Sequence, residues 1–220
     1  LKAERTGRTV KKIDFLPDWI KNWYVNLISP ATDLFIRFGV NPNFFTTVGF
    51  LISIVAAYVM ATGHLRWGGV LILLGGTFDI LDGKVARATD RVTKFGALYD
   101  STLDRYSEVM IFFGLAYYFS RVEVHFLGID WATWIVVAIS IAIGGSIMTS
   151  YIRARAEGLG LECKVGIMQR PERIVYLGFG SIIHQITLVL AILIIAILAN
   201  VTAIQRIYHI WRTEKSTQTL

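Results

Sequence analysis

The feature that most constrains this chain is a succession of apolar stretches, each about as long as a membrane-spanning helix. They lie at residues 44–62, 67–86, 97–119, 131–151, 172–184 and 187–208. A helix needs roughly 20 residues to cross the hydrocarbon core, and a helix satisfies its own backbone hydrogen bonds there. We therefore predict an all-α integral membrane protein with six transmembrane helices. The fifth stretch is short, and its separation from the sixth near His184 and Gln185 is the weakest boundary.

Composition supports the membrane class. Hydrophobic residues make up 54% of the 220 residues, charged residues only 17%, and the mean hydropathy is +0.54. Soluble domains carry roughly 25% charged residues, so a soluble protein of this size is excluded.

Lys and Arg are distributed unevenly along the chain. They are frequent near both termini and in the connections after the second and fourth stretches, whereas the opposite connections contain only Arg66 and Arg121. The positive-inside rule then places both termini and the basic connections in the cytoplasm. This topology accounts for most of the +6 net charge, so we expect contact with membrane lipids and no nucleic-acid partner.

The N-terminal region has its own pattern. Residues 1–16 are polar and basic, and apolar residues recur at helical spacing from Pro17 to Phe38. This pattern indicates an N-terminal amphipathic helix lying in the membrane interface. The expected organisation is a cytoplasmic basic segment with the interfacial helix at residues 1–40, a six-helix membrane domain at 41–212 and a cytoplasmic tail at 213–220.

Aspartates interrupt the second and third stretches at regular intervals. Asp79 and Asp82 lie three residues apart, and Asp100 and Asp104 lie four apart. Each spacing puts its pair on one face of a helix. Because the connection between the two stretches is short, the helices should be antiparallel neighbours, and the four carboxylates should converge near the cytoplasmic surface.

Such a group of carboxylates needs a positive partner, because ionised groups in a membrane are costly and mark functional sites. Hard divalent cations take oxygen ligands and share coordination with substrate phosphates, so we predict a Mg²⁺-type site. The alternative is a set of buried ion pairs with Arg87, Arg91 and Arg105, but the number of aligned spacings disfavours it. The four histidines are scattered and do not suggest zinc, and Cys163, the only cysteine, is interpreted as incidental.

Small residues accompany the aspartates. Gly83, Ala86 and Gly96 share the acidic faces and would leave room for a base and a diphosphate. The alternative is close helix packing, which small residues commonly serve in membranes. We interpret the glycine pairs elsewhere in the stretches as packing residues: Gly68–Gly69, Gly75–Gly76 and Gly144–Gly145.

The segment from Asp79 to Asp104 reads D-x2-D-G-x2-A-R-x8-G-x3-D-x3-D, with every fixed position filled. This pattern resembles the signature of the CDP-alcohol phosphotransferases, membrane enzymes that make phospholipid headgroups. The run Asn41–Thr46 also resembles the family's approach to its first span. With the six-span arrangement, the resemblance covers most of the chain.

The resemblance implies a metal-dependent attack by an alcohol on the β-phosphate of a CDP-linked donor, with release of CMP. It implies that Asp79, Asp82 and Asp100 bind metal, with Asp104 at the edge of the metal site as the general base. Two Mg²⁺ or Mn²⁺ ions, a CDP-diacylglycerol donor, a homodimer and the plasma membrane of a prokaryote are expected by the same resemblance. The implied nucleotide pocket consists of Asp82, Gly83, Ala86, Arg87 and Gly96.

The acceptor is indicated by arginines after the fourth stretch. Guanidinium groups bind phosphate bidentately, although the positive-inside rule alone would also place arginines there. The segments Ser150–Gly160 and Arg170–Arg173 resemble the prokaryotic phosphatidylinositol-phosphate synthases, which use inositol 1-phosphate. The resemblance carries the acceptor site over to Ser150, Arg153, Pro171, Arg173 and Arg206.

Other interpretations remain open at this point. Glycerol 3-phosphate, serine or a free alcohol could replace inositol 1-phosphate as acceptor. An ion-coupled transporter would also carry intramembrane carboxylates, but it would disperse them along a pathway and often show an inverted repeat, which this sequence lacks. A catalytically silent family member would be expected to lose a motif aspartate, and none is lost.

Overall fold

Each of the predicted apolar stretches is a helix in the structure. The structure is a computed structural model and describes residues 28–30, 32, 34–126 and 129–218. The helices of that part of the chain include α2 (Pro42–Ala61), α3 (Leu65–Ala88), α4 (Lys94–Phe119), α5 (Ala132–Gly158), α6 (Arg170–Ile183) and α7 (Gln185–Gln218). A hairpin of β1 (His125–Phe126) and β2 (Ile129–Asp130) joins α4 to α5. The boundary expected near His184 is confirmed, because this residue is extended and separates α6 from α7.

The prediction of an all-α membrane protein is confirmed, apart from the number of membrane spans. The helices α2 and α5 and the α7 segment Gln185–Lys215 are each long and apolar enough to cross a membrane. The helices α3 and α4, with 24 and 26 residues, carry the predicted aspartates, and α6 has only 14 residues. The count of six transmembrane helices therefore stays a prediction. The predicted interfacial helix lies largely outside the described residues.

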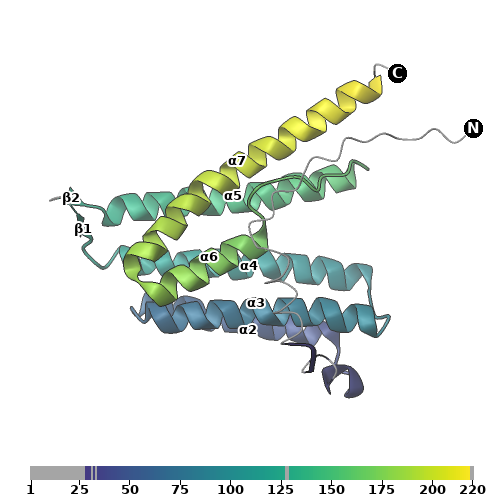
Figure 1. The fold of residues 1–220 in the computed structure, drawn as a ribbon, viewed down its shortest axis with the longest axis horizontal. Helices are drawn as coiled ribbons and strands as arrows, with labels where there is room; N and C mark the ends of the chain where they lie inside the picture. The colour runs from purple at the N-terminus through teal and green to yellow at the C-terminus, as the bar shows by residue number, and fades with distance from the viewer. Residues whose placement is uncertain (1–27, 31, 33, 127–128, 219–220) are drawn as a thin grey trace, which may run out of the picture.

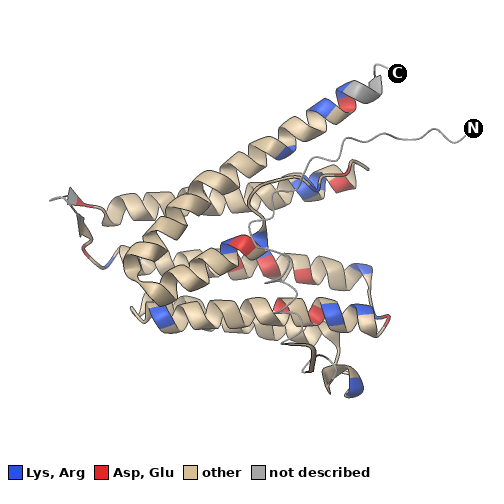
Figure 2. Ribbon diagram, in the orientation of Figure 1, with Lys and Arg blue, Asp and Glu red and all other residues tan. Residues whose placement is uncertain are grey.

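The helices pack side by side, and α7 runs obliquely across the others (Figure 1). Contacts join α2 to α3 and α4, α3 to α6, α4 to α5, and both α5 and α6 to α7. The α5–α6 loop folds back along the bundle, so that α6 begins midway along its length (Figure 1). Lys and Arg gather toward the end with the α3–α4 turn, and acidic residues lie just inside that end (Figure 2).

Local sequence sets where the helices that carry the acidic and basic groups begin. Thr93 caps α4 by accepting the Gly96 N–H at 2.9 Å, and the Gln169 N–H donates to the Glu172 carboxylate at 2.9 Å in the first turn of α6. Side-chain acceptors at these positions satisfy N–H groups that the helix leaves unpaired. Pro171 also lies in the first turn of α6, where its missing N–H is not needed.

Two apolar clusters lie on either side of the acidic residues. The larger one fills the half of the bundle nearer the hairpin and includes Met60, Ile72 and Phe112. The smaller one, at the other end, contains Phe45 and Val85. Dense packing on both sides leaves the helices little freedom to slide, so the register between α2, α3 and α4 is well defined.

Glycines allow several of the close helix contacts. A Cβ at Gly69 would lie 2.6 Å from the Gly178 carbonyl oxygen, and a Cβ at Gly75 would lie 3.4 Å from the Gly49 carbonyl oxygen. At Gly145 it would lie 2.9 Å from the Asn200 backbone nitrogen on α7, whereas at Gly144 nothing lies within 4 Å. The packing interpretation therefore holds for Gly145 and not for its neighbour.

This contrast gives a stability prediction. Gly145→Ala is expected to lower the free energy of unfolding by about 1–3 kcal/mol, because the methyl group would push α5 away from α7. Gly144→Ala, one residue away, should be neutral or slightly stabilising, since alanine favours the helix by about 1 kcal/mol. Thermal unfolding of both variants in detergent measures the difference. Equal stability of the two variants would show that the α5–α7 contact does not require Gly145.

Candidate active site

Asp82 is held by the helix that precedes it. Thr46 on α2 donates its hydroxyl to the Asp82 carboxylate at 2.8 Å, and both residues are buried. Gly49, one turn further along α2, allows a close approach to α3, because a Cβ there would lie 3.1 Å from Asp79 Oδ1. The α2 helix therefore packs against the acidic face of α3 and orients its carboxylates.

The second acidic pair lies on α4. The charge of Asp100 acts on both Asp82 and Asp104, and the charge of Asp79 acts on the other three. The structure thus brings the four aspartates into one electrostatic cluster between α3 and α4. Like charges at this range repel, so the cluster needs a cation to be stable.

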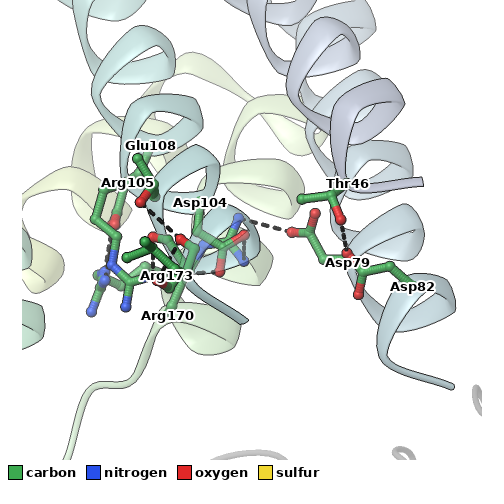
Figure 3. A network of polar contacts seen from close by, with 11 residues as sticks. Thr46, Asp79, Asp82, Asp104, Arg105, Glu108, Arg170 and Arg173 are labelled. Atoms are coloured by element: carbon green, nitrogen blue, oxygen red, sulfur yellow. Dashed lines mark hydrogen bonds and ion pairs between the residues drawn. The ribbon is translucent and has the colours of Figure 1, made fainter. Parts of the chain in front are cut away.

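Arg170, the first residue of α6, supplies such a cation. Its Nη2 lies 2.8 Å from Asp79 Oδ2, and its Nη1 lies 2.8 Å from Asp104 Oδ1. Figure 3 shows the guanidinium between the two carboxylates, which come from α3 and α4. Three helices therefore meet at this residue.

A second ion pair lies deeper in the bundle. Arg173 Nε lies 2.5 Å from Glu108 Oε1 and its Nη2 lies 2.9 Å from Glu108 Oε2, with side-chain exposures of 1% and 4%. Glu108 is one helical turn beyond Asp104, and Arg173 is one turn beyond Arg170. The Arg170–Asp104 and Arg173–Glu108 pairs therefore lie one helical turn apart between α4 and α6 (Figure 3).

The three arginines considered as structural partners of the aspartates have different positions. Arg105 Nη1 lies 3.7 Å from Asp104 Oδ2 and also donates to the Ser101 carbonyl. Arg91 donates to the Gly39 carbonyl at 2.9 Å. Of these three arginines, only Arg105 lies next to an aspartate of the site in the described structure. The shorter contacts to the aspartates come from Arg170.

The predicted nucleotide residues surround the acidic cluster. Arg87 lies next to Gly83, where a Cβ would be 3.2 Å from its Nη1. Gly96 lies beside α2, with its Cβ position 3.3 Å from Asn43 Oδ1. Ala86 is half-buried on α3. These residues lie toward the charged end of the bundle, and their binding of a nucleotide stays a prediction.

The predicted acceptor residues come from three helices. Arg206 on α7 donates to the carbonyls of Val165 and Thr149 at 2.9 and 2.5 Å. The charges of Arg153 and Arg173 act on Arg206, so the three guanidinium groups lie in one region, where Arg153 and Arg173 are each paired with a glutamate. The exposed Arg153 pairs with Glu157 at 2.8 Å, Ser150 is half-buried on α5, and Pro171 is exposed in the first turn of α6.

Two buried guanidinium nitrogen atoms in this region lack a hydrogen-bond partner. Within the described part of the chain, Arg173 Nη1 and Arg170 Nε are buried without a hydrogen-bond partner. A buried donor without a partner is costly and often marks a functional site. Arg173 therefore keeps one donor group for an anion while Glu108 holds the rest of its guanidinium.

The α5–α6 loop also contains the single cysteine. Cys163 is buried, and this burial raises the pKa of its thiol. The thiol is then protonated at neutral pH and is a poor nucleophile. This geometry agrees with the interpretation of Cys163 as incidental.

Sequence reasoning did not assign three residues of this site: Thr46, Glu108 and Arg170. Glu108 follows Asp104 at the same four-residue interval that separates Asp100 from Asp104, so its position on the acidic face was open to the same argument. Thr46 ends the Asn41–Thr46 run and lies in the first turns of the first span, but its contact with Asp82 joins residues 36 positions apart. No local spacing predicts such a contact.

The donor set fits a divalent metal in chemistry and charge. The charges of the four carboxylates act on one another, and two of them already bind a single cationic group, the Arg170 guanidinium. Among the described residues, no group of three or more Asp, Glu, His or Cys side chains is gathered closely enough to hold a metal ion. Metal binding at these aspartates would therefore require the carboxylates to move closer together.

The sequence profile of the CDP-alcohol phosphatidyltransferase family matches residues 39–213. The chain therefore belongs to this family of enzymes. It is 37% identical to an archaetidylinositol phosphate synthase from Methanothermobacter thermautotrophicus, over 86% of this chain and 90% of that protein. It is 34% identical to a phosphatidylinositol phosphate synthase from Mycobacteroides abscessus, over 85% and 84% of the two chains.

Solved structures show the same likeness. The phosphatidylinositol phosphate synthase of Mycobacterium tuberculosis with CDP-DAG bound superposes with a TM-score of 0.73 at 29% identity, covering 84% of this chain and 94% of that one. The same enzyme in complex with manganese and citrate also gives a TM-score of 0.73, over 83% and 88% of the two chains. Family membership makes this chain a multi-pass membrane enzyme and removes the transporter alternative.

Proposed function

We propose that this enzyme transfers the phosphatidyl group of CDP-diacylglycerol to inositol 1-phosphate, giving phosphatidylinositol phosphate and CMP. The observation that carries the proposal is the four-aspartate cluster between α3 and α4, with a cluster of three arginines beside it. An acidic cluster suits a metal-bound diphosphate, and guanidinium groups suit a phosphorylated acceptor. The proposed reaction needs both.

The proposed setting follows from charge and from the family resemblance. We infer six transmembrane helices, with both termini and the active site on the cytoplasmic side of a prokaryotic plasma membrane. The gathering of Lys and Arg at the end that holds the aspartates supports this orientation (Figure 2). A homodimer and two Mg²⁺ or Mn²⁺ ions per active site are part of the same proposal.

Asp104 has the central role in the proposed chemistry. The acceptor hydroxyl oxygen forms a bond to the phosphatidyl phosphorus, the bond to the CMP oxygen breaks, and the hydroxyl proton passes to the Asp104 carboxylate. Divalent metal ions bound by Asp79, Asp82 and Asp100 would neutralise the diphosphate and stabilise the charge on departing CMP. Thr46 would keep Asp82 in its ligating orientation, as a partner outside the metal shell does in metal sites generally.

The acceptor assignment is supported by what the relatives have in common. The archaeal and the bacterial relatives differ in the lipid part of their names, archaetidyl in one and phosphatidyl in the other. Both names contain inositol phosphate. Inositol phosphate as the acceptor is therefore better supported than CDP-diacylglycerol as the donor. A CDP-linked archaetidyl lipid is the second candidate for the donor.

An acceptor screen with the purified enzyme tests this proposal. Labelled CDP-diacylglycerol is incubated with inositol 1-phosphate, glycerol 3-phosphate, serine or free inositol, and the mass of each lipid product is measured. We expect product from inositol 1-phosphate, and product from glycerol 3-phosphate alone would overturn the acceptor assignment. A parallel series with the archaetidyl donor decides the lipid. EDTA should stop the reaction in every arm, and Mg²⁺ or Mn²⁺ should restore it.

A further inference from the structure

Arg170 has no role in the reaction proposed above, yet it makes the shortest ion pairs with the four aspartates among the described residues. It binds Asp79 and Asp104 at 2.8 Å each. Its side chain is 18% exposed, as is that of Asp79, and Asp104 is 14% exposed. Ion pairs this far from water are screened weakly by salt and constrain the groups that form them.

These contacts occupy oxygen atoms that a metal ion would use. Mg²⁺ takes its oxygen ligands at about 2.0–2.1 Å in a strict geometry, so the carboxylates would have to turn toward the ion and away from their present contacts. A dication next to Arg170 would also repel it. The Arg170 guanidinium and a metal ion therefore compete for the negative charge of Asp79.

We propose that Arg170 is a positioning residue that serves as an exchangeable counter-ion. It holds Asp79 and Asp104 across the α3–α4 gap in the metal-free protein, and an entering divalent metal displaces it. The inference rests on the proposed function, which assigns these two carboxylates to the metal site and to the base.

The surroundings of Arg170 make this exchange feasible. It is the first residue of α6, at the end of the loop that begins at Leu159, so it moves without breaking a helix. Its neighbour on the next turn, Arg173, is held by two bonds to Glu108 and anchors α6 to α4. The Arg173–Glu108 pair can therefore stay in place while the contacts of Arg170 open.

Metal binding to the substrate-free protein tests the proposal. Arg170→Gln removes the competing charge and leaves the carboxylates repelling one another, so Mn²⁺ should bind at least about tenfold more tightly than to wild type. Arg170→Lys, which keeps a charge, should fall between the two. Lys164→Gln is the matched control, because it removes one positive charge from an exposed pair with Glu162 and should leave Mn²⁺ affinity unchanged. Calorimetry or Mn²⁺ electron paramagnetic resonance in detergent measures each dissociation constant.

A second measurement separates exchange from a purely structural role. In EDTA, Arg170→Gln should unfold at a lower temperature than wild type, and saturating Mn²⁺ should raise its unfolding temperature by more than it raises that of wild type. If Arg170→Gln binds Mn²⁺ no more tightly than wild type, the exchange is wrong and the proposed function stands. If wild type and variants all bind no Mn²⁺ while folded, the metal site fails, and the proposed function fails with the exchange.

Discussion

Replacing Asp104 with asparagine is expected to lower the rate of phosphatidyl transfer by roughly 10²–10⁴-fold, the range that general acid–base catalysis contributes. Asparagine keeps the size of the side chain, and its carbonyl oxygen can still accept from Arg170, which lies 2.8 Å from Asp104. It cannot take the proton of the acceptor hydroxyl. Binding of the CDP-lipid should change little, since the three other aspartates are unaltered.

Two measurements and one control make this test specific. The turnover rate at saturating donor and acceptor reports the chemistry, and binding of labelled CDP-lipid reports the site. Asp90→Asn makes the same change of charge on the exposed α3–α4 turn, where Asp90 has φ 55°. Asparagine tolerates this left-handed conformation, so this variant should keep nearly full activity. If Asp104→Asn turns over as fast as Asp90→Asn, Asp104 is not the base.

The largest effect on stability is expected at Glu108. Replacing it with alanine leaves the Arg173 guanidinium buried without its carboxylate, and breaking a buried ion pair in this way costs about 3–5 kcal/mol. The pair is 1% and 4% exposed, so water cannot replace the missing partner without opening the bundle. Chemical or thermal unfolding in detergent micelles measures the loss.

An exposed ion pair provides the matched control. Glu157 pairs with Arg153 at 2.8 Å with side-chain exposures of 50% and 46%, so Glu157→Ala should change the free energy of unfolding by about 1 kcal/mol or less. The double variant Glu108→Leu/Arg173→Met should recover much of the loss, because an apolar pair of similar volume removes the uncompensated charge. A loss of the same small size at both glutamates would show that the buried pair does not stabilise the fold.

Hydrophobic stretches and their spacing predicted the six helices and their order well. Membrane helices are long and uninterrupted, so their signal is local and strong. The convergence of the four aspartates was also predictable, because Asp79 and Asp82 share one helix face and Asp100 and Asp104 share the next. The predicted close packing of these two helices is not seen, because α3 and α4 are not among the helix pairs in close contact and both pack against α2 instead. Helical spacing still decides which face of each helix carries its aspartates.

The partners of the aspartates were less predictable. Arg87, Arg91 and Arg105 were considered because they are near in sequence, whereas the cation that binds Asp79 and Asp104 is Arg170. Its position depends on how the α5–α6 loop folds back along the bundle and where α6 then begins (Figure 1). A loop of this kind carries no periodic signal, so its path follows from packing between distant helices.

The motif resembled the family that the sequence profile then showed. The membrane class and the acidic cluster were predictable from the apolar stretches and the aspartate spacings. Each depends on contacts within one helix or across one short turn, whose geometry is nearly invariant. Tertiary structure decided the rest: Thr46 on Asp82, Glu108 on Arg173, and Arg170 between two helices. These contacts join side chains that lie far apart in the sequence, and their pairing is set by how the helices pack rather than by any local pattern.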